Sequence, residues 1–415
     1  MKIRTGRRWR NTIGTFSVWP LRQYLPQSLG DLQQAVREAQ QAGVRLRAVG
    51  SGHSYSDVAL ATGFQVNLKH LNQVLPLDIN TLQPQAAEQP LLQVQAGMTI
   101  QQLNKELDRR RLAVTNMGGI DNQTIAGAIA TGTHGTGIDY PAIHGMVRSM
   151  VLVADGGRAY RIEPTNGPTL PRQHDEPGVD LIQDDDYFYS VLVSLGCMGI
   201  VYSYLLEVED QYWLRESKQL ITWPEARRKL EAGQYFRAED AEGRPLRGAQ
   251  LQINPYCVKK AEAPSCLEVR HYLLRDGLPK RSIGQRTRAL VSSVFGGLPI
   301  TYLATIALLK IRPAFAVQLI ESSLRSVQDR EFTGRAHRVL YQGFEYVKQR
   351  AYSAEFAFDA TNGQYIAALE AMITYLEQAA QMGNHYQTSP FGLRFVRASG
   401  AYLSADAFKT IVDME

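Results

Sequence analysis

The chain has 415 residues, of which 44% are hydrophobic and 20% charged, and its formal net charge is +5. This length predicts two or three domains, or one large α/β domain with a second lobe, in a soluble globular protein. No stripe of lysine and arginine with interleaved aromatics is present, so we expect no nucleic-acid partner. The three cysteines are widely spaced, which indicates neither a disulfide framework nor a Cys-x-x-Cys metal site.

The N-terminal region alternates predicted helices and strands. Residues 28–42 are expected to form a helix, because Ser28 can cap it and apolar residues recur on one face. A strand over 44–49 then runs into the tight turn 50–53. A second strand is expected over 64–68, where polar and apolar residues alternate.

The middle of the chain continues this alternation. Residues 91–96 repeat the strand pattern, and Thr99 opens a helix with a capping box to Gln102. Residues 116–137 are expected to be a loop, a short helix and a second loop, rich in glycine. Further elements are expected at 149–154, 159–162 and 200–208 (strands) and at about 187–195 (a helix).

The composition of the sequence changes after about residue 210, where glycine clusters become rarer and long helical patterns become more frequent. We therefore place a domain boundary there. In this second part we expect a strand over 351–358, a helix over 364–380 and a strand around 393–396. The chain stops inside an expected strand over 407–415, which predicts that it is a fragment of a longer protein.

One uncharged stretch, residues 289–309, is long enough to span a bilayer. Gly296-Gly297-Leu298-Pro299 interrupts it, so two short buried or interfacial helices are favoured over membrane contact, which remains the alternative. The N-terminus is basic but lacks the apolar core of a signal peptide. We expect a cytoplasmic protein, with membrane association through 289–309 as the second possibility.

Three glycine clusters, at 50–52, 127–137 and 196–199, each adjoin a strand-like run. Glycine lets a backbone approach a ligand closely, so together they predict a cradle for one extended phosphate-containing ligand. Tyr55 stands where the Rossmann fingerprint needs its third glycine, and no Gly-Lys-Ser/Thr follows a glycine run, which excludes a P-loop. The eight histidines do not cluster at metal spacing, so we expect no metal site.

The combination of three blocks resembles a known family. They are Val49-Gly50-Ser51-Gly52-His53-Ser54, Gly118-Gly119, and Thr124-Ile125-Ala126-Gly127 continuing to Ala130-Thr131-Gly132-Thr133-His134-Gly135-Thr136-Gly137. They resemble the FAD-binding half of the vanillyl-alcohol-oxidase/PCMH flavoproteins, nearest to the aldonolactone and alditol oxidases. The resemblance implies an α+β fold, with a two-subdomain PCMH-type FAD-binding domain over 12–210. An α+β cap (substrate) domain over 211–415, incomplete at its C-terminus, would follow.

The resemblance also implies the cofactor and its site. FAD is expected, with His53 covalently bonded to the flavin 8α-methyl; a turn histidine that bonds locally is the alternative for this residue. For His134, a cofactor contact and a structural hydrogen bond stay open. The expected cofactor-binding residues are Val49, Gly50, Ser51, Gly52, His53, Ser54, Tyr55, Asn116, Met117, Gly118, Thr124, Gly127, Ala130, Thr131, Gly132, Thr133, His134, Gly135, Gly199 and Ile200.

The cap carries a weaker resemblance. Residues 353–358 resemble a cap strand, and residues 389–396 resemble the strand that faces the flavin. The family has Glu-x-Arg in that strand, and this chain keeps Arg394, the expected catalytic residue, but has Gly392 at the glutamate position. A candidate acceptor for a substrate hydroxyl is therefore missing, which leaves lactone specificity open.

The resemblance implies an FAD-linked oxidase of the D-arabinono-1,4-lactone oxidase type. A CH–OH group of a sugar lactone or polyol would give a hydride to flavin N5, and O₂ would be the acceptor. One alternative is a dehydrogenase that passes electrons to a membrane or soluble carrier. Another, motivated by Gly392, is a flavin-binding protein with impaired catalysis.

Overall fold

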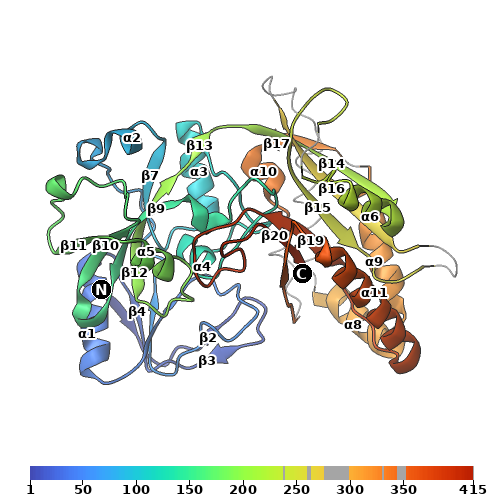
Figure 1. Cartoon of the computed structure of the whole chain (residues 1–415). Coiled ribbons are helices and arrows are strands. Elements are labelled where there is room, and N and C mark those ends of the chain that lie inside the picture. The colour runs from blue at the N-terminus through green and yellow to red at the C-terminus, as the bar shows by residue number, and fades with distance from the viewer. Residues whose placement is uncertain (237–238, 259–262, 275–298, 330, 344–351, 415) are drawn as a thin grey trace.

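The computed structural model describes residues 1–236, 239–258, 263–274, 299–329, 331–343 and 352–414. Figure 1 shows the N-terminal elements gathered on one side of the molecule and the C-terminal sheet with its helices on the other. Strands β19 (Phe391–Val396) and β20 (Ile411–Met414) lie where the two sides meet. The C-terminal strands thus stand close to the N-terminal half.

The first sheet has the order β1-β4-β6-β5, and helix α1 (Leu29–Gln41) follows β4. As predicted, Ser28 caps α1 and accepts a hydrogen bond from the Asp31 backbone N–H. The strand predicted over 64–68 is confirmed as β6, in which Phe64, Gln65 and Val66 are all buried. This strand pairs with β4 and β5, so it is a central strand of the sheet and not an edge strand. The strands are β1 (Lys2–Arg4), β4 (Arg22–Leu25), β5 (Leu46–Val49) and β6 (Phe64–Asn67).

The second sheet has the order β11-β10-β9-β12-β7. Helix α3 (Ile100–Arg110) begins with the predicted capping box between Thr99 and Gln102. The strands are β7 (Leu91–Gln95), β9 (Val147–Val153), β10 (Ala159–Glu163), β11 (Val179–Gln183) and β12 (Ile200–Glu207). The other helices of this half are α2 (Pro84–Ala87), α4 (Ile125–Ala130) and α5 (Asp185–Leu192). Short strands pair as β2 (Trp9–Arg10) with β3 (Ser17–Val18) and β8 (Leu112–Ala113) with β13 (Glu209–Asp210).

The C-terminal half is built on a seven-stranded antiparallel sheet of order β17-β14-β16-β15-β19-β20-β18. Its three longest strands were not predicted, because burial along β15 and β16 is nearly continuous and hides the period-2 signal. The predicted strands at 351–358 and 393–396 correspond to β18 and β19; residue 351 lies outside the described residues. The remaining strands are β14 (Trp213–Thr222), β15 (Leu246–Ile253), β16 (Ser265–Leu274), β17 (Phe332–Arg335) and β18 (Phe356–Asp359).

Helices cover the cap sheet on the side away from the N-terminal half (Figure 1). They include α11 (Gln364–Gly383), which the sequence predicted, together with α6 (Trp223–Glu231) and α9 (Phe315–Arg325). Helix α10 (Ala336–Leu340) lies on the opposite side. Of the uncharged stretch 289–309, residues 289–298 lie outside the described residues, and α8 (Pro299–Ile311) covers the rest. None of the helices in the described part of the chain combines the length and apolarity that crossing a membrane requires.

The two halves are joined where residues 134–140 reach into the cap sheet. The Gly137 N–H donates to the carbonyl of Phe395 over 2.7 Å. The Thr136 hydroxyl donates to the carbonyl of Ala249 and accepts from the Phe395 N–H over 3.3 Å. This segment therefore bonds to both β15 and β19, and we call residues 134–140 the clamp.

A buried arginine reinforces the clamp. The Arg247 guanidinium of β15 lies between the rings of Tyr140 and Tyr212, at 4.1 and 3.8 Å from their centroids. It also donates to the Thr115 carbonyl over 2.9 Å and to a carboxylate oxygen of Glu209 over 2.8 Å. A cation removed from water needs such partners, so this contact fixes β15 against the N-terminal half.

Two glycines allow the backbones to come this close. A Cβ on Gly135 would lie 2.3 Å from Asn116 Oδ1 and 2.4 Å from the Met117 carbonyl oxygen. A Cβ on Gly248 would lie 2.6 Å from the Thr136 carbonyl oxygen. Any side chain at either position would push the clamp away from its partners.

Gly135→Ala is expected to lower the free energy of unfolding by about 1–3 kcal/mol, because the new methyl group collides with backbone and a buried amide. Thermal or urea unfolding measures the change. Gly30→Ala is the matched control: its Cβ would meet nothing closer than 3.9 Å within α1, so it should leave stability unchanged or raise it. Equal stability of Gly135→Ala and the wild type would contradict the close packing of the clamp.

Candidate functional site

An open cavity lies in the N-terminal half, and residues from all three glycine clusters line it. Ligand and cofactor sites are typically concave surfaces of this kind. Arg47 fixes one wall, since its guanidinium donates to the carbonyl of Leu195 over 2.5 Å, next to the third cluster. The predicted cofactor-binding residues that line the cavity are Val49, Gly50, Ser51, Gly52, His53, Ser54, Thr124, Gly127, Ala130, Thr131, Gly199 and Ile200.

The turn after β5 is shaped by its contact with α4. A Cβ on Gly50 would lie 2.2 Å from Thr124 Oγ1. Thr124 caps α4, because its hydroxyl accepts a hydrogen bond from the Gly127 N–H over 3.3 Å. The Ser51 hydroxyl donates to the Asn122 carbonyl over 2.6 Å, which ties the turn to the same loop. Only glycine at position 50 lets the turn and the helix cap meet at the cavity wall.

His53 is half-buried in the cavity wall. Burial disfavours the charged imidazolium and lowers the pKa of His53 below its ordinary value. The side chain is therefore neutral at pH 7, and the neutral imidazole is the form that can act as a nucleophile.

The other predicted cofactor-binding residues do not line this cavity. Tyr55 is 42% exposed, and a Cβ on Gly132 would lie 3.3 Å from Ser404 Oγ, in the C-terminal loop. Asn116 and Met117 are buried beneath the clamp. Those at or beside the junction of the two halves are Asn116, Met117, Gly118, Thr133, His134 and Gly135.

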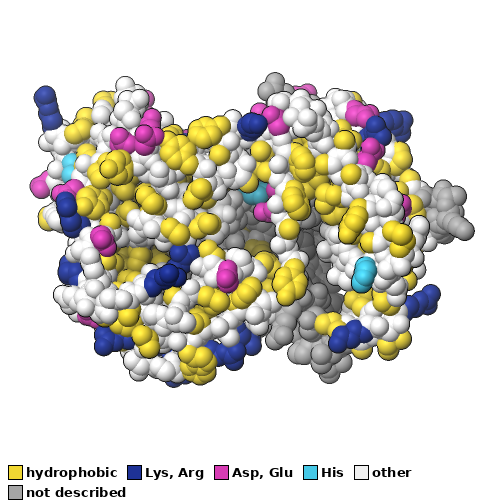
Figure 2. Space-filling model, turned by 60° about the horizontal axis from the view of Figure 1, so that its bottom comes forward, with side chains coloured by type: hydrophobic (Ala, Val, Ile, Leu, Met, Phe, Trp, Pro, Cys, Tyr) yellow, Lys and Arg dark blue, Asp and Glu magenta, His cyan; other side chains and the backbone are white. Residues whose placement is uncertain are grey.

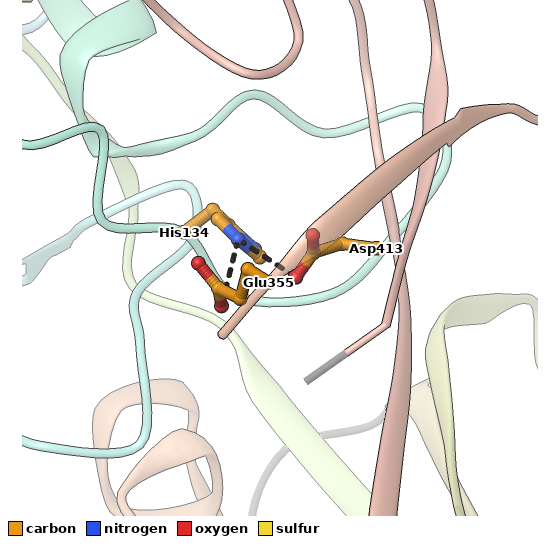
Figure 3. A group of neighbouring side chains, drawn as sticks. All are labelled: His134, Glu355 and Asp413. Carbon is orange, nitrogen blue, oxygen red and sulfur yellow. Dashed lines mark ion pairs between the residues drawn. The ribbon is translucent and has the colours of Figure 1, made fainter. Parts of the chain in front are cut away.

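His134 of the clamp lies in a cluster of charged side chains from the cap (Figure 3). Its Nε2 is 3.4 Å from Asp413 Oδ2 and 3.7 Å from Glu355 Oε1, while its Nδ1 lies 3.0 Å from the Gly135 carbonyl oxygen. Arg394 of β19 pairs directly with Asp413 of β20, so their side chains share a face of the sheet. Figure 2 shows that the surface is hollowed where the two halves meet.

Opposing effects act on the pKa of His134. Burial lowers it and the nearby Arg394 charge lowers it further, but Asp413 and Glu355 together raise the pKa of His134 above its ordinary value. Both ring nitrogens face oxygen atoms, which an imidazolium satisfies because both of its nitrogens are donors. The two carboxylates and the two facing oxygens thus favour the charged form of the His134 ring.

The sequence reasoning found His134 and Arg394 but missed Glu355 and Asp413. The ligand atoms of His134, Glu355 and Asp413 lie within 4.8 Å of one another, a separation that would also admit a metal ion. We had expected no such group, because its members are far apart in the sequence and no spacing rule connects them. The sequence placed Glu355 in an expected strand over 351–358 and Asp413 in one over 407–415, but nothing in it connected these strands with His134.

Residues 20–163 match the FAD binding domain family, so the chain contains an FAD-binding domain. It is 31% identical over 211 residues to an L-gulono-1,4-lactone dehydrogenase of Mycobacterium tuberculosis, covering 51% of this chain and 43% of that protein. It is 30% identical over 210 residues to a D-arabinono-1,4-lactone oxidase of Yarrowia lipolytica, covering 51% and 36%. The predicted resemblance to the aldonolactone oxidases is confirmed, although the matches span less than half of either relative.

The structure is also similar to that of a solvent-stable cholesterol oxidase, with a TM-score of 0.70 and 16% sequence identity. The match covers 98% of this chain and 79% of that one. The predicted α+β fold, with a PCMH-type FAD-binding domain followed by a cap, is confirmed.

The residues present fit FAD. The cavity offers a glycine turn that a Cβ would fill, hydroxyl groups of Ser51, Ser54, Thr124 and Thr131, and apolar walls such as Val49 and Ile200. Exposed backbone N–H groups and hydroxyls can bond a pyrophosphate, and apolar side chains can contact ring systems.

Gly50→Ala is expected to weaken FAD binding at least tenfold, because its methyl group would displace Thr124 from the cavity wall. The flavin-to-protein absorbance ratio and a binding titration measure this. Gly30→Ala, far from the cavity in α1, is the control and should keep wild-type flavin content. Full flavin content in Gly50→Ala would show that the turn at Gly50 is not part of the cofactor site.

Proposed function

We propose that the chain is an FAD-dependent oxidoreductase that oxidises the CH–OH group of a sugar lactone or polyol. In this proposal residues 12–210 bind FAD and residues 211–415 form the cap that holds the substrate. The main support is that one short segment connects the cavity to the charged cluster. Thr131 lines the cavity, and three residues later His134 contacts the cluster beside Arg394. A single extended cofactor placed along this segment would bring its redox ring to the cluster.

The proposed site residues divide between two tasks. His53 would tether the cofactor through a bond to the flavin 8α-methyl, and the remaining residues of the cavity and of the clamp would bind it. FAD, when bound, supplies the acceptor for the hydride that leaves the substrate carbon. Arg394 would stabilise the negative charge that develops on the substrate oxygen as its proton departs.

We propose O₂ as the electron acceptor, as in an oxidase of the D-arabinono-1,4-lactone type. The names of the relatives include both an oxidase and a dehydrogenase, so similarity to them does not identify the electron acceptor, and an experiment must. H₂O₂ is measured with D-arabinono-1,4-lactone, L-gulono-1,4-lactone, xylitol and cholesterol. Turnover with an artificial dye but not with O₂ would assign a dehydrogenase, and bound flavin without turnover by any acceptor would contradict the proposal.

Arg394→Met is expected to lower the anaerobic rate of flavin reduction by about 10²–10³-fold, because it removes a charge that stabilises the transition state. Stopped-flow absorbance at the flavin band measures the rate. Arg397→Met is the matched control, since Arg397 is exposed just beyond β19 and should retain the wild-type rate. Equal effects of the two substitutions would exclude a special role for Arg394.

His53→Ala is expected to abolish covalent flavin while leaving some FAD bound noncovalently. After acid precipitation, wild-type flavin fluorescence should remain in the pellet, and that of His53→Ala should move to the supernatant. His70→Ala, at an exposed histidine outside the cavity, is the control and should behave as the wild type does. Free flavin released by the wild type would show that no bond forms.

A further inference from the structure

The flavin-facing strand lacks a carboxylate at Gly392, but the neighbouring strands supply two. Arg394 of β19 and Ala357 of β18 both pair with Asp413 of β20, so the three side chains form one row on one face of the sheet. Gly392 lies two residues before Arg394, and Glu355 lies two residues before Ala357. Glu355 immediately precedes β18, so it stands at the end of that strand, beside this row.

The two carboxylates differ in access. The Asp413 side chain is 1% exposed, whereas that of Glu355 is 47% exposed. A substrate can therefore reach Glu355 but not Asp413. Figure 3 shows both carboxyl groups directed at His134, that of Asp413 from β20 and that of Glu355 from the segment just before β18.

Asp413 acts on this arrangement through His134. The buried Asp413 carboxylate lies 3.4 Å from His134 Nε2, and a buried charge needs such a partner. His134 is in turn fixed by the bond to its own neighbour Gly135. The same ring nitrogen lies 3.7 Å from Glu355 Oε1, so the charged form of His134 attracts the Glu355 carboxylate as well.

We propose that Glu355 is the catalytic acceptor of the substrate hydroxyl proton, in place of the carboxylate that Gly392 lacks. The buried pair His134–Asp413 positions it. The inference rests on the proposed function. The substrate O–H bond breaks and its proton bonds to a Glu355 oxygen, while the C–H bond gives its electron pair and hydrogen to FAD as hydride. The substrate carbon and oxygen are left joined by a double bond.

The charged groups that face His134 from the surrounding described elements are Asp413 of β20, Arg394 of β19 and Glu355 before β18. Counting His134 itself, two of these groups are basic and two are acidic. A basic group beside the substrate oxygen favours the departure of the proton from the hydroxyl.

The first test compares Glu355→Gln with the wild type in anaerobic flavin reduction, using D-arabinono-1,4-lactone, L-gulono-1,4-lactone and xylitol. A lost general base predicts a rate about 100-fold lower at pH 7, and loss of the wild-type fall in rate at acid pH, where a carboxylate base is protonated. Glu355→Asp should recover part of the rate. Glu331→Gln, which removes an exposed carboxylate paired with Arg215 in the same cap, is the matched control.

The second readout does not depend on turnover. Histidine NMR of the FAD-loaded protein, with the His134 signal assigned from His134→Gln, should give a titration midpoint above the ordinary histidine range. Asp413→Asn should lower that midpoint, because the carboxylate that favours the charged ring is gone. A lactone should shift the His134 signal in the wild type and not in Glu355→Gln.

The outcomes separate the inference from the proposed function. A Glu355→Gln variant that keeps its flavin and reduces it within twofold of the wild-type rate would overturn the inference alone. A stoichiometric metal ion, bound by the wild type and lost in Glu355→Gln, would overturn it as well. If no probe reduces wild-type flavin, the proposed function fails. In that case, a lactone-induced shift of the His134 signal that requires Glu355 would still support Glu355 as the contact of the substrate hydroxyl. The absence of any shift would overturn both the inference and the proposed function.

Discussion

The entry of residues 134–140 between strands β15 and β19 is the constraint on which the rest of the site depends. The hydroxyl of Thr136, the backbone N–H of Gly137 and the stacked Arg247 hold the cap sheet against the FAD-binding domain. His134 leads this segment, so its ring enters the cap at a fixed position. The same contact therefore binds the two halves together and places a titratable group beside Arg394.

Local signals in the sequence predicted much of the N-terminal half. Ser28 and Thr99 are caps whose side-chain bonds involve only their own helices, so the helix starts could be read directly. The turn at Gly50 and the cap at Thr124 meet in the structure to form one wall of the cavity. That these two segments line one cavity was predictable because the glycine blocks resemble those of a known cofactor-binding domain.

The cap and its charged cluster were less predictable, for physical reasons. Strands β15 and β16 are covered on both faces, which removes the alternation that reveals a strand. Glu355 and Asp413 reach His134 only because β18, β20 and β19 pair in one particular register, and register between distant segments is not encoded in local spacing. Gly135 was expected to contact the cofactor, yet its lack of a Cβ is required by Asn116 and Met117.

In the proposed function, the cavity and the cluster around His134 are the two ends of one cofactor site. The most direct test is a crystal structure of the FAD-loaded protein. The account predicts that one FAD occupies the cavity beside Gly50 and Thr124, and that its isoalloxazine ring lies within contact of His53, His134 and Arg394. An FAD whose ring turns away from the cap and leaves His134 and Arg394 without contact would contradict it.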